Sequence, residues 1–390
     1  MEEKQTTKIA LIRGNSLNEW EAKVWATLPA SFEVTGICGR KNVYSTKNIP
    51  FSVKKLSCLA DSRLRGLFGR YVFARNEKLI GLEKELAAYD IAHTAEISNF
   101  YTVQAVRAKK NNPRLKVVCT VWDNSIGRFE TTWGRFAITP PTFWYRIMAR
   151  YIREVILGVD LFLSVSDVTT AFLIERGVPK EKIRKILPAV TTACDNQGAQ
   201  EFLLKHRLES GMFYVMVNRL VREKGVYDVL YAWKELVTKE NIQKKLVIIG
   251  NGPERKHLIN LVKAYGIDHG VIFVASVPNA IVKGLYRHAR ALVLGSVPTP
   301  IWQEQFGYVL AESISAHTPV ITTYSGAIPE VVGSAGIVVA PGNVAELKHA
   351  FCDMERDDVC GRLKEQCLKE YTRFSQERFV KDLCDAYSHL

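Results

Sequence analysis

Residues 213–250 read FYVMVNRLVREKGVYDVLYAWKELVTKENIQKKLVIIG, and this stretch decides the fold class. Its two ends, 213–217 and 245–250, are short apolar runs with few polar interruptions, as in strands that are covered on both faces. A longer segment with helical spacing of its apolar residues joins them. Strand, helix and strand in this order predict a parallel βαβ unit.

The same alternation runs along the whole chain. Further strands are expected at 8–13, 32–38, 90–93, 116–121, 160–166, 271–274, 291–294, 319–323 and 336–339. We therefore expect an α/β protein with two Rossmann-like parallel-sheet domains, one over 1–190 and one over 211–370, joined by a polar linker at 191–210. Because open parallel sheets bind ligands beyond the carboxyl ends of their strands, the site is expected in a cleft between the two domains.

Composition excludes several classes of protein. The 390 residues are 47% hydrophobic and 24% charged, which is typical of a packed globular chain and not of a disordered one. No apolar run reaches the roughly eighteen residues of a membrane-spanning helix. The charged start, MEEKQTTKIALIRG, lacks the apolar core of a secretory leader, and the eight cysteines form no C-x-x-C pair. We expect a cytoplasmic protein with reduced thiols.

The positive charge is unevenly distributed. The formal net charge is +13, and residues 1–200 contribute 30 basic against 19 acidic side chains, which leaves 23 against 21 for residues 201–390. Such an asymmetry predicts an anionic partner for the first half: a phosphate group, a nucleic acid or an acidic membrane surface. No recognised nucleic-acid-binding motif is present, so nucleic acid is the least favoured of the three.

Missing motifs narrow the chemistry further. The loop after the first strand reads RGNSLNEW and not G-x-G-x-x-G, which argues against a dinucleotide-dependent redox enzyme. The chain has no G-x-x-x-x-G-K-[ST] phosphate loop and no H-E-x-x-H. It also has no D-x-D, which argues against a diphosphate clamped through a chelated metal. We expect no metal site.

Two stretches of the second half carry residues suited to an anionic ligand. In VNRLVREKGVYDVLYAW, 217–233, a strand ends in a loop with Arg219 and Lys224 and a helix follows, so that cations and backbone N–H groups converge. In EQFGYVLAESISAHTPVI, 304–321, Glu304 precedes a helix that contains Glu312, and carboxylates accept well from the hydroxyls of a diol. Taken singly, the first is also explained as a solvated basic loop and the second as a capping and an exposed glutamate.

The order of these motifs resembles the nucleotide-sugar half of the family 4 glycosyltransferases, which have the GT-B fold. R-x-x-x-x-K-G at 219–225 is followed by G-x-G-P at 250–253 and by E-x-F-G-x-x-x-x-E at 304–312. The resemblance is strong over 211–355 and weaker before it, where 89–93 and 158–183 look like family landmarks. It also implies that a C-terminal helix at 371–390 crosses back to the first domain.

The resemblance implies a retaining transfer from a UDP- or GDP-sugar without a metal or other cofactor. Arg219 and Lys224 would bind the donor diphosphate, and Glu304 the donor sugar. The remaining donor-binding residues would be Gly14, Gly250, Val277, Phe306, Gly307, Tyr308 and Glu312, the last of these on the ribose.

The first half departs from the family pattern, and its candidates are less specific. The resemblance places His93 near the sugar as a catalytic candidate, although a histidine satisfied within the protein is an equal alternative. Glu96 and Trp122 are acceptor candidates, and Glu96 is equally a helix-capping carboxylate.

The stretch 133–156 mixes aromatic residues and arginines, with apolar residues recurring along a helical face. An anionic leaflet and an ordinary core-facing helix both explain it, and the second is slightly favoured. We expect the enzyme to lie on the inner membrane face and to act on a lipid or lipid-linked glycan. The alternatives are a soluble glycan, protein or small-molecule acceptor, another kind of GT-B sugar-nucleotide enzyme, or nucleic-acid binding.

Overall fold

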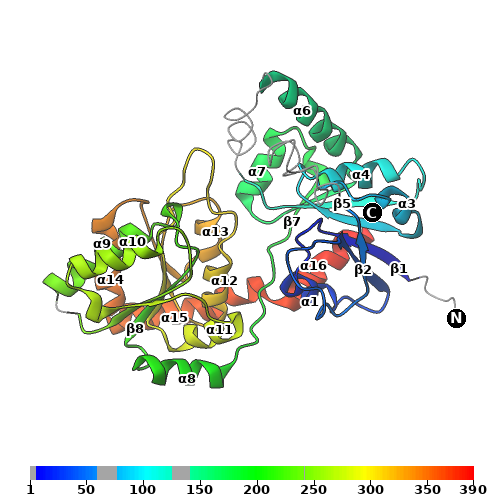
Figure 1. Ribbon diagram of the computed structural model, residues 1–390. Helices are drawn as coiled ribbons and strands as arrows, with labels where there is room; N and C mark the ends of the chain where they lie inside the picture. The colour runs from blue at the N-terminus through cyan, green and yellow to red at the C-terminus, as the bar shows by residue number, and fades with distance from the viewer. Residues whose placement is uncertain (1–5, 59–76, 125–140, 241) are drawn as a thin grey trace. The chain divides into compact units, whose positions relative to one another are not determined.

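The computed structural model describes residues 6–58, 77–124, 141–240 and 242–390. The chain divides into two compact units (Figure 1), the first made of residues 1–187 with 379–390 and the second of residues 188–378. Within the described residues all eight cysteines are free thiols. None of the described helices combines the length and the apolar character that crossing a bilayer requires.

A parallel sheet of seven strands forms the centre of the first unit, in the order β3-β2-β1-β4-β5-β6-β7. Its strands are β1 (Thr7–Ile12), β2 (Phe32–Gly39), β3 (Val53–Leu56), β4 (Ile91–Ala95), β5 (Lys116–Val121), β6 (Leu161–Ser164) and β7 (Ile183–Lys185). The expected strands are all present, and β3 and β7 are additions at the two edges. These edge strands are short and carry charged residues, as unpaired sheet edges commonly do, so the apolar pattern does not reveal them.

Both faces of this sheet are buried. Along β1, Ala10 and Ile12 pack into one apolar cluster, while Ile9 and Leu11 pack into the other. This alternation follows from the two-residue period of a strand. The α-helices among the described residues of this unit are α1 (Glu19–Trp25), α3 (Leu82–Glu85), α4 (Phe100–Ala108), α6 (Pro141–Gly158) and α7 (Asp167–Glu175), and the end of α16 (Gln376–Ser388).

The second unit contains a parallel sheet of six strands in the order β10-β9-β8-β11-β12-β13. They are β8 (Phe213–Val217), β9 (Lys245–Ile249), β10 (Val271–Val274), β11 (Ala291–Leu294), β12 (Val320–Thr323) and β13 (Gly336–Val339). The helices are α8 (Asn196–His206), α9 (Val226–Lys239), α10 (Arg255–Ala264), α11 (Asn279–His288), α12 (Tyr308–Ser315), α13 (Ile328–Val332), α14 (Val344–Glu355) and α15 (Asp357–Glu370). Two parallel-sheet α/β units were expected, and the structure confirms them.

The segments that join the units differ from their expected form. Residues 191–210, expected as a linker, contain α8, which begins where the Asp195 side chain accepts a hydrogen bond from the Gly198 N–H (2.9 Å) and which packs on α11. Near the C-terminus, a short 3₁₀ turn, Tyr371–Phe374, belongs to the second unit. Helix α16 then carries residues 379–390 into the first unit, where Leu383 and Tyr387 pack against Ile9 and Leu11 of β1.

Helix α6 covers part of the stretch that suggested a membrane segment. Residues 125–140, with Trp133, Arg135 and Phe136, lie outside the described residues. Val155 of α6 is buried in the core of the first unit, and Tyr151 and Ile156 pack against the same cluster. Arg146, Arg150 and Arg153 are exposed. The described part of this helix is therefore core-facing, as the simpler of the two interpretations predicted.

Candidate functional site

The candidate donor site lies in the second unit, on loops at the carboxyl ends of its central strands. Strand β8 leads into the loop with Asn218 and Arg219 and into a 3₁₀ turn, Arg222–Lys224, before α9 begins. Gly225 joins the turn to the helix with φ +61°, a conformation that costs glycine nothing. A Cβ at Gly225 would stand 1.6 Å from the carbonyl oxygen of Gly295, which follows β11. The close approach of these two glycines brings the β8 and β11 loops together.

Lys224 and Glu304 meet at this junction, although 80 residues separate them in the sequence. The Lys224 Nζ lies 2.6 Å from the Glu304 Oε2, with the two side chains 20% and 11% exposed. Ser296 donates its hydroxyl to the same carboxylate oxygen (2.9 Å). The Lys224 ammonium also stands 4.7 Å from the centre of the Trp302 ring. An ammonium and a carboxylate are thus held together at the carboxyl ends of the parallel strands.

The backbone around Glu304 is fixed by further hydrogen bonds. Its N–H donates to the Ser325 hydroxyl (3.2 Å), and its carbonyl accepts from the Ala327 N–H (3.0 Å). Phe306, at 1% exposure, packs its ring against Tyr308 and Phe374 and anchors the start of α12. Its side chain is therefore part of the core, and only its backbone is available to a ligand.

Gly307 precedes α12 with φ +84°, and Tyr308 opens the helix with an exposed side chain. The first N–H groups of a helix have no partner within it, and they carry a partial positive charge. These groups at the start of α12 follow directly on Glu304 in the chain. An anionic group would be stabilised at this helix end.

Glu312 lies further along α12 and has its own partners on α11. Asn279 donates to its Oε1 (3.2 Å), and the Lys283 Nζ lies 3.7 Å from the same atom. Lys283 also donates to the Thr191 hydroxyl (2.6 Å). Burial raises the pKa of Glu312, and the charge of Lys283 opposes that rise. Glu312 is therefore a largely buried carboxylate, 12% exposed, with one amide and one ammonium partner.

The other donor candidates of this unit occupy neighbouring loops. Arg219 is exposed, two residues after the end of β8, and no ion pair with it occurs within the described ranges. Gly250 follows β9 with φ +150°, and a Cβ there would stand 1.9 Å from the Asn218 carbonyl oxygen. Gly250 therefore allows the ends of β8 and β9 to approach. Val277 lies half-buried in the loop between β10 and α11.

Some residues of this cluster were not predicted from the sequence. Ser296, Trp302 and Ser325 lie in loops whose neighbours only the folded sheet defines. Asn279 and Lys283 carried a usable signal, because polar residues four apart share one face of a helix. Among the described residues, no three or more histidine, cysteine or carboxylate side chains are grouped so that they could hold a metal ion.

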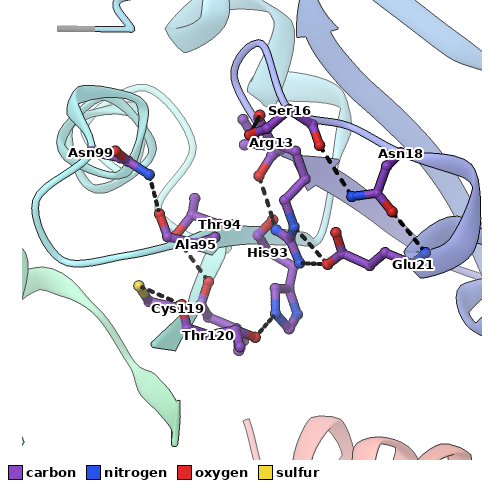
Figure 2. A network of polar contacts seen from close by, with 12 residues as sticks. Arg13, Ser16, Asn18, Glu21, His93, Thr94, Ala95, Asn99, Cys119 and Thr120 are labelled. Carbon is purple, nitrogen blue, oxygen red and sulfur yellow. Dashed lines mark hydrogen bonds and ion pairs between the residues drawn. The ribbon is translucent and has the colours of Figure 1, made fainter. Parts of the chain in front are cut away.

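His93 belongs to a buried polar network of the first unit, shown in Figure 2. Its Nδ1 lies 2.6 Å from the Tyr387 hydroxyl and its Nε2 lies 2.7 Å from the Thr120 hydroxyl. Burial lowers the pKa of His93 well below its usual value, and the nearby Arg13 charge adds to the effect. Both ring nitrogens are thus engaged within the protein. This geometry agrees with the alternative of a histidine satisfied within the protein, and a contact of His93 with the donor sugar stays a prediction.

Arg13 stabilises the same network from the loop after β1. Its guanidinium binds Glu21 through Nε (2.8 Å) and Nη2 (2.7 Å), and its Nη1 donates to the carbonyl oxygens of Ile12 (2.9 Å) and His93 (3.1 Å) (Figure 2). Gly14 follows with φ +51°, and a Cβ there would overlap the Glu77 carboxylate. Gly14 thus serves a tight turn.

The two acceptor candidates contact one another in the first unit. Glu96, with φ +65°, accepts hydrogen bonds from the backbone N–H groups of Trp122 (3.0 Å) and Asp123 (3.4 Å). Its carboxylate therefore holds the loop after β5. Trp122 is half-buried beside it. A loop fixed in this way can present Trp122 to a ligand.

Comparison with known proteins identifies a family that the second half of the chain resembles. Residues 203–374 match the family model described as "Glycosyl transferases group 1". An uncharacterized glycosyltransferase of Methanocaldococcus jannaschii is 34% identical over 131 residues, which are 33% of this chain and 32% of that protein. The chain spans between about a third and two thirds of the length of the curated relatives that it matches.

Solved structures resemble the whole chain. The Anabaena protein HepE in complex with UDP superposes with a TM-score of 0.75 at 14% identity, covering 99% of this chain and all of that one. The lipopolysaccharide outer core galactosyltransferase WaaB gives a TM-score of 0.67 at 16% identity over 98% of this chain and all of that one. The chain has the two-unit GT-B fold, and its residues 203–374 form a glycosyltransferase group 1 domain.

Proposed function

We propose that this protein is a retaining glycosyltransferase that moves a sugar from a UDP- or GDP-sugar to an acceptor without a metal ion. The observation that carries the proposal is the Lys224–Glu304–Ser296 cluster inside the group 1 domain. Buried ion pairs cost desolvation energy and are weak devices for stability alone. A pair at the carboxyl ends of parallel strands is therefore better explained by a ligand that uses both charges.

Each side chain of the donor site has a role in this proposal. Arg219 and Lys224 bind the diphosphate, with the backbone N–H groups at the start of α12. Glu304 accepts from the hydroxyls of the donor sugar, and Glu312 accepts from the ribose hydroxyls. Gly250 and Val277 border the nucleoside. The exposed position of Arg219 and the partial exposure of Lys224 leave both cations accessible to phosphate oxygens.

The chemistry that we propose needs no protein nucleophile. The bond between the anomeric carbon and the diphosphate oxygen breaks, and the acceptor oxygen bonds to the same face of that carbon. The departing diphosphate oxygen takes the acceptor proton. The protein's contribution is to stabilise the negative charge that grows on the diphosphate, which Lys224, Arg219 and helix-end N–H groups can do. Alignment of donor and acceptor supplies the rest.

For the acceptor we propose a lipid or lipid-linked glycan at the cytoplasmic face of a membrane, bound by the first unit near Trp122. The support is the excess of basic residues in the first half of the chain and the loop that Glu96 holds. The match to a lipopolysaccharide galactosyltransferase is compatible with this acceptor class, but it concerns the fold. A soluble glycan, a protein or a small molecule as acceptor is an outcome that the same assays would reveal.

Thermal shift with nucleotides in EDTA tests the donor half of the proposal. UDP or GDP is expected to raise the melting temperature, while duplex DNA is not. NMR of the product then reads the anomeric configuration, which is expected to equal that of the donor. No shift with any nucleoside diphosphate, or an inverted product, would contradict the proposal.

A further inference from the structure

An exposed surface of the first unit combines aromatic residues with positive charge. Trp20 of α1 is 55% exposed and packs edge-on against Tyr44, which is 41% exposed, with ring centres 4.7 Å apart. Val43 beside them is 75% exposed. Exposed apolar clusters with a polar rim mark interaction sites more often than single exposed residues do. We call these three residues, with Arg40, Lys41 and Lys47, the β2–β3 loop patch.

The loop that carries the patch is held in place by its own hydrogen bonds. The Asn42 side chain accepts from the Leu17 N–H (3.0 Å) and donates to the carbonyl oxygens of Leu17 (2.7 Å) and Tyr44 (2.8 Å). The Val43 N–H donates to the Asn15 carbonyl (2.8 Å). The Asn42 amide thus fixes the loop from within, and the exposed side chains of Val43 and Tyr44 stand on a fixed backbone.

The charge around these apolar residues is positive. Residues 39–58 contain Arg40, Lys41, Lys47, Lys54 and Lys55 and no acidic residue. The first three of these, in the patch, are exposed. Both acidic side chains of α1 are paired: Glu19 with Lys23 (2.7 Å) and with the Asn48 amide (3.2 Å), and Glu21 with Arg13 (2.7 Å). The patch therefore attracts anions and offers little to repel them.

The patch also lies at the edge of the sheet where the parallel strands have their carboxyl ends. The loop follows β2, and Trp20 lies in the helix after β1, so both belong to the carboxyl ends of parallel strands (dark blue in Figure 1). Gly14 lies at the same edge, two residues after β1, and Glu96 directly follows β4. A partner bound at the patch would therefore be on the side of the first unit where a ligand is expected.

We propose that the β2–β3 loop patch docks this protein on an anionic lipid surface. Tryptophan and tyrosine are the side chains that favour the headgroup region, and lysine and arginine near an acidic leaflet add attraction that falls off within a Debye length. A neutral partner would leave the three cations unused, and a purely electrostatic one would leave Trp20, Val43 and Tyr44 unused. The aromatic side chains and the cations each attract the membrane weakly, and together they give reversible binding to it. The inference rests on the proposed function only for the acceptor that docking would serve.

Vesicle co-sedimentation of the full chain tests the proposal, with vesicles of 70% phosphatidylcholine and 30% phosphatidylglycerol and with pure phosphatidylcholine. Binding is expected to the first and not to the second, and to weaken at high salt. The variant R40Q/K41Q/K47Q should partition roughly a hundredfold more weakly, because each charge contributes about fivefold. The variant W20S/V43S/Y44S should also lose most binding at unchanged net charge.

A matched control removes three exposed charges elsewhere. The variant R362Q/K364Q/K369Q on α15 lowers the net charge equally, and it should stay within about twofold of the wild type. All variants should keep the wild-type circular dichroism and the UDP-induced thermal shift, which separates docking from donor binding. Equal loss in the control would mean that net charge alone drives binding. That result would overturn the proposal. So would vesicle binding of both patch variants as strong as that of the wild type, or binding through the patch to soluble heparin but not to vesicles.

Discussion

Replacing Lys224 by methionine is the most informative perturbation of the donor site. The change removes the ammonium 2.6 Å from Glu304 and leaves that carboxylate, 11% exposed, with the Ser296 hydroxyl still donating to it but without this cation. Removing one partner of a buried pair typically costs about 3–5 kcal/mol. Because Lys224 is a fifth exposed and Ser296 stays, we expect a loss of about 3 kcal/mol.

The expected loss converts to a measurable shift. For a unit of about 190 residues, 1 kcal/mol moves the melting temperature by about 2–4 °C, so the second unit of Lys224→Met should melt roughly 6–12 °C lower. Differential scanning calorimetry records this transition. UDP at a hundred times its dissociation constant should stabilise the wild type by about 2.7 kcal/mol and the variant far less.

A second substitution separates stability from binding. In Lys224→Met/Glu304→Gln no buried charge is left unpaired, so we expect the stability to return to within about 1 kcal/mol of the wild type. The UDP effect should remain absent, because the cation that holds the diphosphate is still missing. If Lys224→Met melts within 1 °C of the wild type and retains the full UDP shift, the pair has neither the energetic nor the binding role assigned to it.

Three further predictions concern single positions. Burial depresses the pKa of His93 in the folded protein, so neutral His93 contributes stability above the unfolded pKa of about 6.5, and this contribution is lost as the pH falls. In urea titrations, the free energy of unfolding should therefore fall between pH 7.5 and 5 by about 2 kcal/mol more in the wild type than in His93→Asn. Because burial raises the pKa of Glu312, its protonation on acidification should weaken UDP binding, so that the calorimetric UDP affinity falls more steeply toward acid pH in the wild type than in Glu312→Gln, which should bind weakly throughout. The titration of the UDP phosphate is common to both proteins, so equal pH profiles would exclude Glu312 from the site. Gly225→Ala should lower the stability by more than about 3 kcal/mol, because its Cβ meets the Gly295 carbonyl, while Gly266→Ala, at φ +65° with open space around it, should cost only about 1 kcal/mol in the same thermal melts.

The fold was largely predictable because its signals are local. Most of the predicted strands are near-continuous apolar runs, and the alternation with helical segments predicts parallel pairing. Strands β3 (VKKL) and β7 (IRK) were missed because edge strands tolerate charge and shortness. Helix α8 was missed because its start, Asp195 to Gly198, consists of residues equally common in turns and at helix caps.

The site was predictable only in part because its contacts are not local. Lys224 and Glu304 could be named from their motifs, but their contact depends on β8 and β11 being neighbours in the sheet. The sequence order of the strands does not state this adjacency, since β9 and β10 intervene along the chain and lie on the other side of β8. Ser296 and Trp302 become neighbours of Lys224 by the same route, without a motif of their own.

His93 shows why a polar residue at the end of a strand does not by itself indicate a ligand contact. Its two ring nitrogens are both engaged, one by Tyr387 from a helix 294 residues away, so it has no hydrogen-bonding capacity left for a substrate. Lys224 lies in the loop region after a strand of the other sheet, but an ammonium has three donors, and the hydrogen bond to Glu304 engages one of them. Unused donors on a side chain that is one-fifth exposed are what a diphosphate requires. The capacity that remains after internal pairing, and not residue type or position, therefore distinguishes the functional candidate from the structural one.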